Sequence, residues 1–159
     1  MEGTASFPTT VPWAPNPDGP RTLAQAIAFV ESRGVSILDE VEFHVVEDDA
    51  LPAHVHASYS SPADGALRVE WEDFKGLREK ILVRVKRSVL NSDEAILAVI
   101  SHEMHELNTL DELFAVRKTM PGTEVARLIT AKYGGTLHKE AWDVSDMLVK
   151  RLRSDRKKP

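Results

Sequence analysis

The residues best suited to chemistry are concentrated in one short segment, His102-Glu103-Met104-His105-Glu106. Imidazole and carboxylate groups bind transition metals and also transfer protons, so their clustering is typical of a metal-dependent catalytic site. The chain has no cysteine, which excludes a thiol nucleophile, a cysteine-ligated zinc site and an iron–sulfur cluster. The chemistry of the segment therefore depends on which of its histidine and glutamate side chains face the same way.

The segment lies inside a predicted helix, so helical geometry assigns a direction to each side chain. At about 100° per residue, the predicted core face lies about 60–160° from His102. Glu103 falls at about 100°, in the middle of that face, and Glu106 at about 40°, on its edge beside His102. His105 falls at about 300° and points away. The core face is made of Ile96, Val99, Ile100, Leu107, Leu110 and Phe114.

Two of these residues can share a ligand. His102 and Glu106 are four residues apart, so they lie on adjacent turns and can bind the same ion. A third ligand must come from another element, and His138 is the best candidate because it lies on the apolar side of the last predicted helix. Two histidines and one carboxylate form a catalytic zinc set with one open position, although iron or manganese also accept it. Glu103 is then placed as the general base for a metal-bound water.

The segment from His102 to Glu106 resembles the H-E-x-x-H helix of the zincin metallopeptidases, with glutamate in place of the second histidine. The order of elements is also similar, because strands precede a capped helix with the motif and a later helix supplies a third ligand. The resemblance spans about residues 80–150. It implies a zinc-dependent hydrolase of proteins or peptides, with His102 as ligand and Glu103 as base. Glutamate for histidine at position 106 changes the charge and the metal preference of the site.

Two other functions fit the same residues. One is a non-catalytic protein-interaction or immunity-type module, in which the His–Glu cluster is a buried ionic lock and Glu103 is a paired charge. The other is a 2-His-1-carboxylate iron enzyme, since Fe(II) accepts the same ligands.

A second histidine cluster competes with the first. His54 and His56 alternate in a predicted strand, so they share one face, and His44 on another strand is a possible neighbour. If that face meets the motif helix, these histidines join or replace the set above. The alternating residues Val55 and Ala57 are the expected buried ones, which instead favours a solvent-exposed histidine face.

The elements that must position these residues form an α+β domain. We predict a small antiparallel or mixed sheet of about four strands, packed against a long C-terminal helical region, with one N-terminal helix. Prolines are concentrated in residues 1–20, which are predicted as an extended arm; residues 21–153 form the domain and 154–159 a basic tail. The predicted strands are 41–46, 53–60, 67–71 and 81–86, and the predicted helices are 22–33, 93–120, 123–133 and 136–153.

Composition and charge narrow the classes of partner. Of the 159 residues, 42% are hydrophobic and 28% are charged, which is the balance of a globular domain. The net charge is −5, and six of the 20 basic residues lie in the last ten positions, so the rest of the chain is strongly acidic and we expect no nucleic-acid surface on it. No run approaches the roughly 20 apolar residues of a membrane span, and no signal peptide is evident. The expectation is a chain without a membrane span and, by default, a cytoplasmic location.

Overall fold

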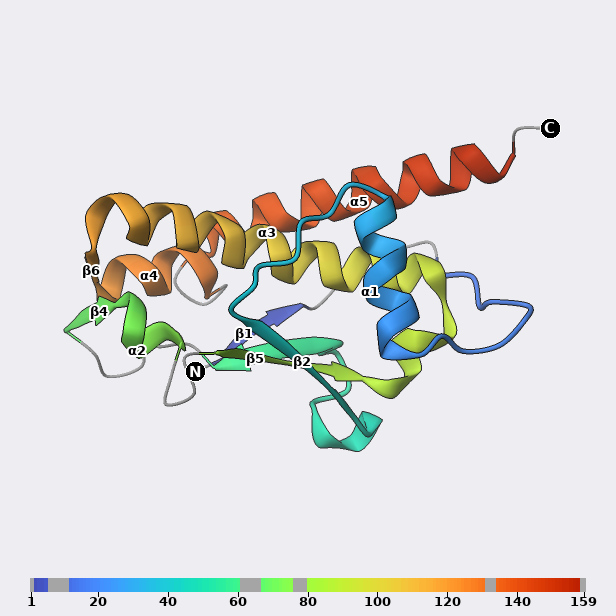
Figure 1. Ribbon diagram of the computed structural model, residues 1–159, viewed down its shortest axis with the longest axis horizontal. Coiled ribbons are helices and arrows are strands. Elements are labelled where there is room, and N and C mark those ends of the chain that lie inside the picture. The colour runs from blue at the N-terminus through green and yellow to red at the C-terminus, as the bar shows by residue number, and fades with distance from the viewer. Residues whose placement is uncertain (1, 6–11, 61–66, 76–79, 131–133, 158–159) are drawn as a thin grey trace.

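The protein is built from a sheet and two helical layers (Figure 1). The structure is a computed structural model that describes residues 2–5, 12–60, 67–75, 80–130 and 134–157. The long helix α3 (Asp93–Arg117) crosses the sheet, and α5 (Thr136–Arg156) lies on the other side of α3. The predicted α+β class is therefore confirmed. None of the described helices is long and apolar enough to cross a membrane.

The main sheet is mixed and has the strand order β1-β3-β5-β2. The pairs β1–β3 and β3–β5 are antiparallel, whereas β5–β2 is parallel. In β5, Ile81, Val83 and Val85 are buried and Leu82 is exposed, because successive side chains point to opposite faces. The strands are β1 (Glu2–Ala5), β2 (Val41–Val46), β3 (Ala57–Ser60) and β5 (Ile81–Lys86).

The predicted strand 53–60 is wrong in its first half. Only its last four residues are extended, because the chain before them turns. The amide of Val55 donates to the carbonyl of Pro52 at 3.0 Å. The ammonium group of Lys86 donates to the carbonyls of Pro52 and Ala53, at 2.7 and 3.3 Å, and fixes that turn.

The predicted strand 67–71 does not belong to the main sheet. Its central part, β4 (Arg68–Glu70), pairs with β6 (Thr119–Pro121) in a separate two-stranded sheet. The same pairing ends α3 before the predicted Met120, since Lys118 has a φ of 67° and turns the chain into β6. The fourth strand of the main sheet is instead β1, which lies inside the predicted arm.

The helices agree better with the sequence. Thr22 and Gln25 form a capping box at the start of α1, and the side chain of Ser92 accepts a hydrogen bond from the amide of Ala95 at the start of α3. The helix predicted over 123–133 is observed as α4, and residues 131–133 lie outside the described residues. The remaining helices are α1 (Leu23–Ser32), α2 (Trp71–Lys75) and α4 (Gly122–Ile129), with 3-10 turns at Asp48–Ala50 and Arg87–Asn91.

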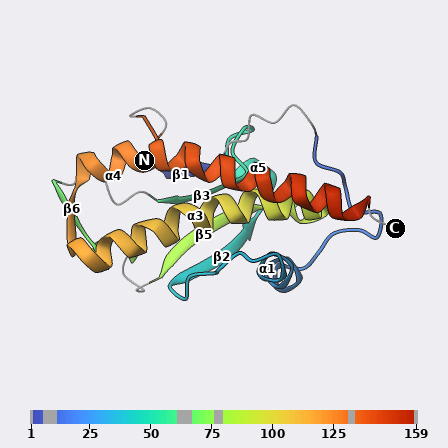
Figure 2. The ribbon, with the colours of Figure 1, turned by 90° about the horizontal axis from the view of Figure 1, so that it is seen from above.

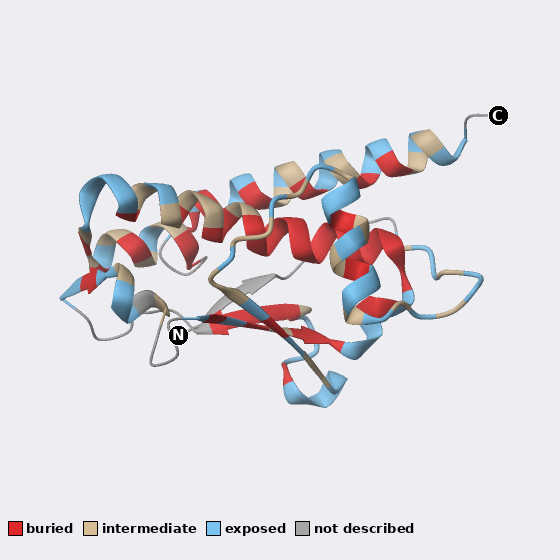
Figure 3. Cartoon of the chain, in the orientation of Figure 1, coloured by how far each residue is buried: buried red, intermediate tan, exposed pale blue. Residues whose placement is uncertain are grey.

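Helix α3 is the centre of the core. Every residue from Asp93 to Met104 is buried, and Figure 3 shows this half of α3 between the sheet and α5. Seen from above, α5 runs over α3 and α1 lies at the side, next to β2 (Figure 2). Two layers therefore cover opposite sides of one helix.

Five charged residues join the segment before α1 and the end of α5 to the start of α3. Arg21 donates two hydrogen bonds of 2.9 Å to the carboxylate of Asp93. Arg153 and Arg156 reach the carboxylate of Glu94 at 2.8 and 2.9 Å. We call these five residues the N-terminal clasp of α3. The division into arm, domain and tail stays a prediction, although α5 continues past residue 153 to Arg156.

Candidate metal centre

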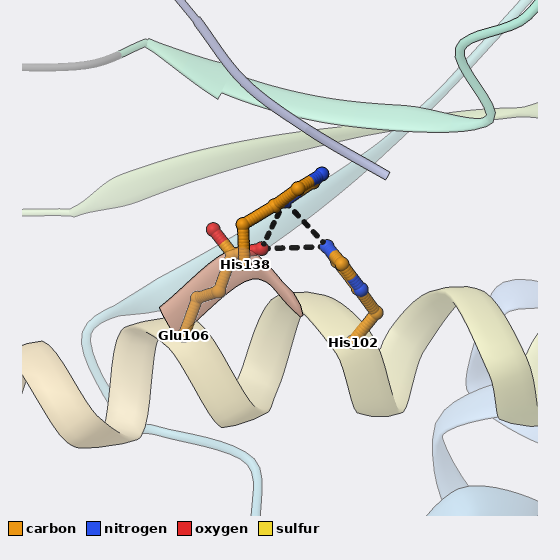
Figure 4. A group of neighbouring side chains, drawn as sticks. All are labelled: His102, Glu106 and His138. Carbon is orange, nitrogen blue, oxygen red and sulfur yellow. Dashed lines mark hydrogen bonds and ion pairs between the residues drawn. The ribbon is translucent and has the colours of Figure 1, made fainter. Parts of the chain in front are cut away.

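Three predicted ligands meet between α3 and α5 (Figure 4). His102 Nε2 lies 2.6 Å from Glu106 Oε2, and His138 Nδ1 lies 3.0 Å from the same oxygen. The two histidine nitrogens are 3.1 Å apart. The relative exposures of His102, Glu106 and His138 are 0, 0 and 3%. Among the described residues, these three side chains form a group whose ligand atoms are close enough to hold a metal ion.

The donor atoms fit a metal ion in number and kind. Two imidazole nitrogens and one carboxylate oxygen suit zinc, iron and manganese. A tetrahedral zinc ion with bonds of about 2.1 Å separates its ligand atoms by about 3.4 Å. The observed separations of 2.6–3.1 Å are shorter by less than an ångström, so small side-chain movements make room for an ion.

The positions of the three candidate ligands follow from helical spacing. His102 and Glu106 are one turn apart on α3, and His138 lies in the first turn of α5. The two imidazole rings meet edge to face, with centroids 4.7 Å apart. Trp142, one turn after His138, places its ring 4.7 Å from that of His138 and 6.0 Å from that of His102. The i,i+4 spacing from His138 is the signal that could have linked Trp142 to the site.

The ionised member of the group is Glu106. Burial raises the pKa of this carboxyl, but the hydrogen bonds from His102 and His138 outweigh burial and hold its pKa below the usual range. The site therefore has a buried negative charge that faces two imidazoles.

Tyr59 on β3 is a member of the site that the sequence analysis missed. Its hydroxyl donates a hydrogen bond of 2.8 Å to Glu106 Oε1, the carboxylate oxygen that faces away from the histidines. Tyr59 is fully buried, and burial together with the charges of Glu106 and Glu103 raises its pKa. It therefore remains protonated and acts as a donor. Its alternation with Ala57 in the predicted strand indicated a buried side chain, but nothing local indicated its partner.

Glu103 is fully buried, as its place on the predicted core face implies. Neither of its carboxylate oxygens has a hydrogen-bond partner among the described residues. Burial, and then the charge of Glu106, raise the pKa of Glu103 well above its usual range. The expectation that Glu103 is the paired charge of an ionic lock is therefore wrong, because the histidines pair with Glu106 instead.

His105 lies outside the group, as its helical direction predicts. Its Nε2 is 2.9 Å from Glu140 Oε1 on α5, and the two side chains are 24 and 63% exposed. This contact is an exposed hydrogen bond outside the group of His102, Glu106 and His138.

The second histidine cluster does not join the site. His54 is exposed and precedes β3, so the strand alternation expected of His54 and His56 is absent. The ring of His56 packs edge to face against Trp13 at 4.9 Å, and burial lowers its pKa. His44 contacts Glu42 at 3.1 Å on the exposed side of β2. The burial of Val55 and Ala57 agrees with the prediction.

The function of the site has to follow from the chemistry of its own residues. That chemistry comprises a buried group of two histidines and a carboxylate, with a second buried carboxyl within one turn of α3. No protein family matches the chain, and no curated protein or solved structure matches it either.

Proposed function

We propose that the chain is a metal-dependent hydrolase of zincin-like design that acts on a peptide or protein. The observation that carries this proposal is Glu103, whose buried carboxyl has no hydrogen-bond partner among the residues described. It lies within one turn of the ligands His102 and Glu106. A buried polar group without a partner costs stability, and carboxyls in such surroundings are concentrated at catalytic sites. A role as general base explains why a carboxyl is present at this buried position.

Each residue then has a defined role. His102, Glu106 and His138 would hold the ion, and three protein ligands are the number found in catalytic zinc sites. When bound, zinc supplies a coordinated water whose pKa is near 7. Glu103 would take up the proton that an attacking water molecule loses as its oxygen bonds to the substrate carbonyl carbon. When the carbon–nitrogen bond breaks, Glu103 returns the proton to the leaving amine and is regenerated.

A non-catalytic protein-interaction module is the second candidate function. The observation that favours it is the burial of His102, Glu106 and His138, whose facing atoms Nε2, Oε2 and Nδ1 lie 2.6–3.1 Å apart. In that case the three residues form an ionic lock centred on Glu106, which fixes α5 against α3. Removal of one member of such a lock costs about 3–5 kcal/mol.

Elemental analysis of the untagged protein separates the candidates. The hydrolase proposal predicts about one zinc ion per chain, bound more weakly after substitution of His138. One iron ion per chain supports a 2-His-1-carboxylate iron enzyme, which uses the same ligands. A metal-free protein whose melting temperature is unchanged by zinc or a chelator supports the interaction module and contradicts the hydrolase.

The role of Glu103 is tested by Glu103→Gln, with His105→Gln as the matched control on the same helix. Glutamine has the same shape as glutamate, so we expect zinc content and melting temperature to stay close to those of the wild type. Hydrolysis of a mixture of quenched fluorescent peptides should fall by about 10² or more, because the base is lost. His105→Gln should keep full activity. A Glu103→Gln protein that is as active as the wild type refutes the proposed base.

A further inference from the structure

We infer that Tyr59 fixes how Glu106 binds the metal and thereby sets which metal the site prefers. This inference rests on the proposed metal centre. Glu106 uses its two oxygens differently, because Oε2 faces the ligand nitrogens of His102 and His138 whereas Oε1 accepts the 2.8 Å hydrogen bond from Tyr59. Tyr59 therefore holds one oxygen of Glu106 away from the ion.

The hydrogen bond limits Glu106 to one coordinating oxygen. With a one-oxygen Glu106, the group supplies three ligand atoms, which is the number found in catalytic zinc sites with an open fourth position. Manganese prefers six ligands that are mostly oxygens, so a carboxylate free to bind through both oxygens suits it better. The contact from Tyr59 consequently favours zinc over manganese.

The hydroxyl of Tyr59 is rigidly placed. Its strand β3 lies between β1 and β5, where Tyr59 is opposite Gly3 and Val83. The side chain is 0% exposed, so it has no solvent-facing alternative position. A donor on an inner strand orients a ligand more strictly than a donor on a loop does.

The test is Tyr59→Phe, which removes only the hydroxyl. Its control is Ser145→Ala, which removes another buried hydroxyl, 2.8 Å from Ser101 on the α3–α5 interface. Dissociation constants for zinc and manganese are measured by competition with a chelating dye. We expect Tyr59→Phe to bind zinc about 10–100-fold more weakly and manganese with a smaller loss, so that the zinc-to-manganese preference falls. Ser145→Ala should keep the preference of the wild type.

The outcomes separate this inference from the proposal beneath it. A wild-type chain that binds no zinc overturns the metal centre and this inference with it. If the wild type binds zinc and Tyr59→Phe keeps the same zinc-to-manganese preference, only the role of Tyr59 is overturned. The same holds if Ser145→Ala lowers the preference equally, because the effect is then general to buried hydroxyls.

A second measurement applies if Tyr59→Phe does not fold. In a Tyr133→Phe chain, Tyr59 is the one remaining tyrosine. Zinc draws electron density from Glu106 and weakens the hydrogen bond that its carboxylate accepts from Tyr59. Ultraviolet resonance Raman bands of tyrosine should therefore shift until one equivalent of zinc is bound. Tyrosine bands that stay unchanged at saturating zinc overturn the inference.

Discussion

Zinc should stabilise the folded protein through His102 and not through His105. The two histidines lie on the same helix, three residues apart, but only His102 belongs to the buried group. His102→Gln removes the imidazole ligand and keeps an N–H donor that can face Glu106. His105→Gln is the control, because it replaces a partly exposed histidine outside the buried group. The pair therefore separates loss of a ligand from loss of a histidine.

The size of the effect follows from binding to the folded state alone. A ligand at 100 times its dissociation constant stabilises by about 2.7 kcal/mol. The unfolded chain competes weakly, because it has no cysteine and only 6 histidines. In a chain of 159 residues, 1 kcal/mol shifts the melting temperature by about 2–4 °C, so we expect an increase of about 5–11 °C.

The assay is differential scanning calorimetry of chelator-treated, untagged protein, with and without zinc. Wild type and His105→Gln should show the same zinc-dependent increase, since the exposed pair of His105 with Glu140 is worth at most about 1 kcal/mol in either condition. His102→Gln should show no increase. Equal increases in all three proteins place the metal elsewhere, on exposed histidines such as His54. No increase in the wild type refutes the metal centre.

The N-terminal clasp yields two further predictions. Glu94→Gln should lower the free energy of unfolding by about 1–3 kcal/mol in urea denaturation, because Glu94 is buried and Arg153 and Arg156 reach it. The control is Lys150→Gln, which breaks an exposed pair with Asp146 and should lower the free energy of unfolding by less than about 1 kcal/mol. Burial raises the pKa of Glu94, but the hydrogen bond from Arg153 and its neighbours outweighs burial, and the pKa lies below its usual 4.5. The clasp is therefore fully stabilising above about pH 5 and weakens as the pH falls, so denaturation at pH 5, 4 and 3 should show a smaller loss for Glu94→Gln than for the wild type.

The grouping of His102, Glu106 and His138 could be predicted from the sequence because the direction of each side chain follows from local helical spacing. The spacing of His102 and Glu106 fixes their relative direction on any regular helix, and the apolar pattern of α5 indicates that His138 faces inward. The apolar pattern of α3 was less informative, because it predicts one core face whereas the helix is buried on two sides. Ser101 lies outside that face and is buried against Ser145 of α5. Periodicity identifies one apolar stripe. It therefore underestimates how much of a helix is buried when two layers cover it.

The missed features depend on contacts between distant parts of the chain. Tyr59 is 47 residues from Glu106, and no local pattern specifies which buried donor a carboxylate meets. β1 is short and pairs with β3 across more than 50 residues, so its role as the fourth strand follows from sheet pairing rather than from its own sequence. The turn before β3 was missed for the same reason, since Lys86 of β5 fixes it.

The departure from the H-E-x-x-H pattern is explained by where position 106 lies. Its side chain is between two layers, with His138 of α5 on one side and Tyr59 of β3 on the other. A glutamate has an acceptor oxygen for each side, so it can face a metal or two imidazoles and still accept the tyrosine hydrogen. A histidine that used one nitrogen for the metal would turn an N–H toward Tyr59 and could not accept the hydrogen bond that the hydroxyl now donates to Glu106. In this fold, glutamate at position 106 therefore satisfies both neighbours, whereas the histidine of the zincin pattern would satisfy one.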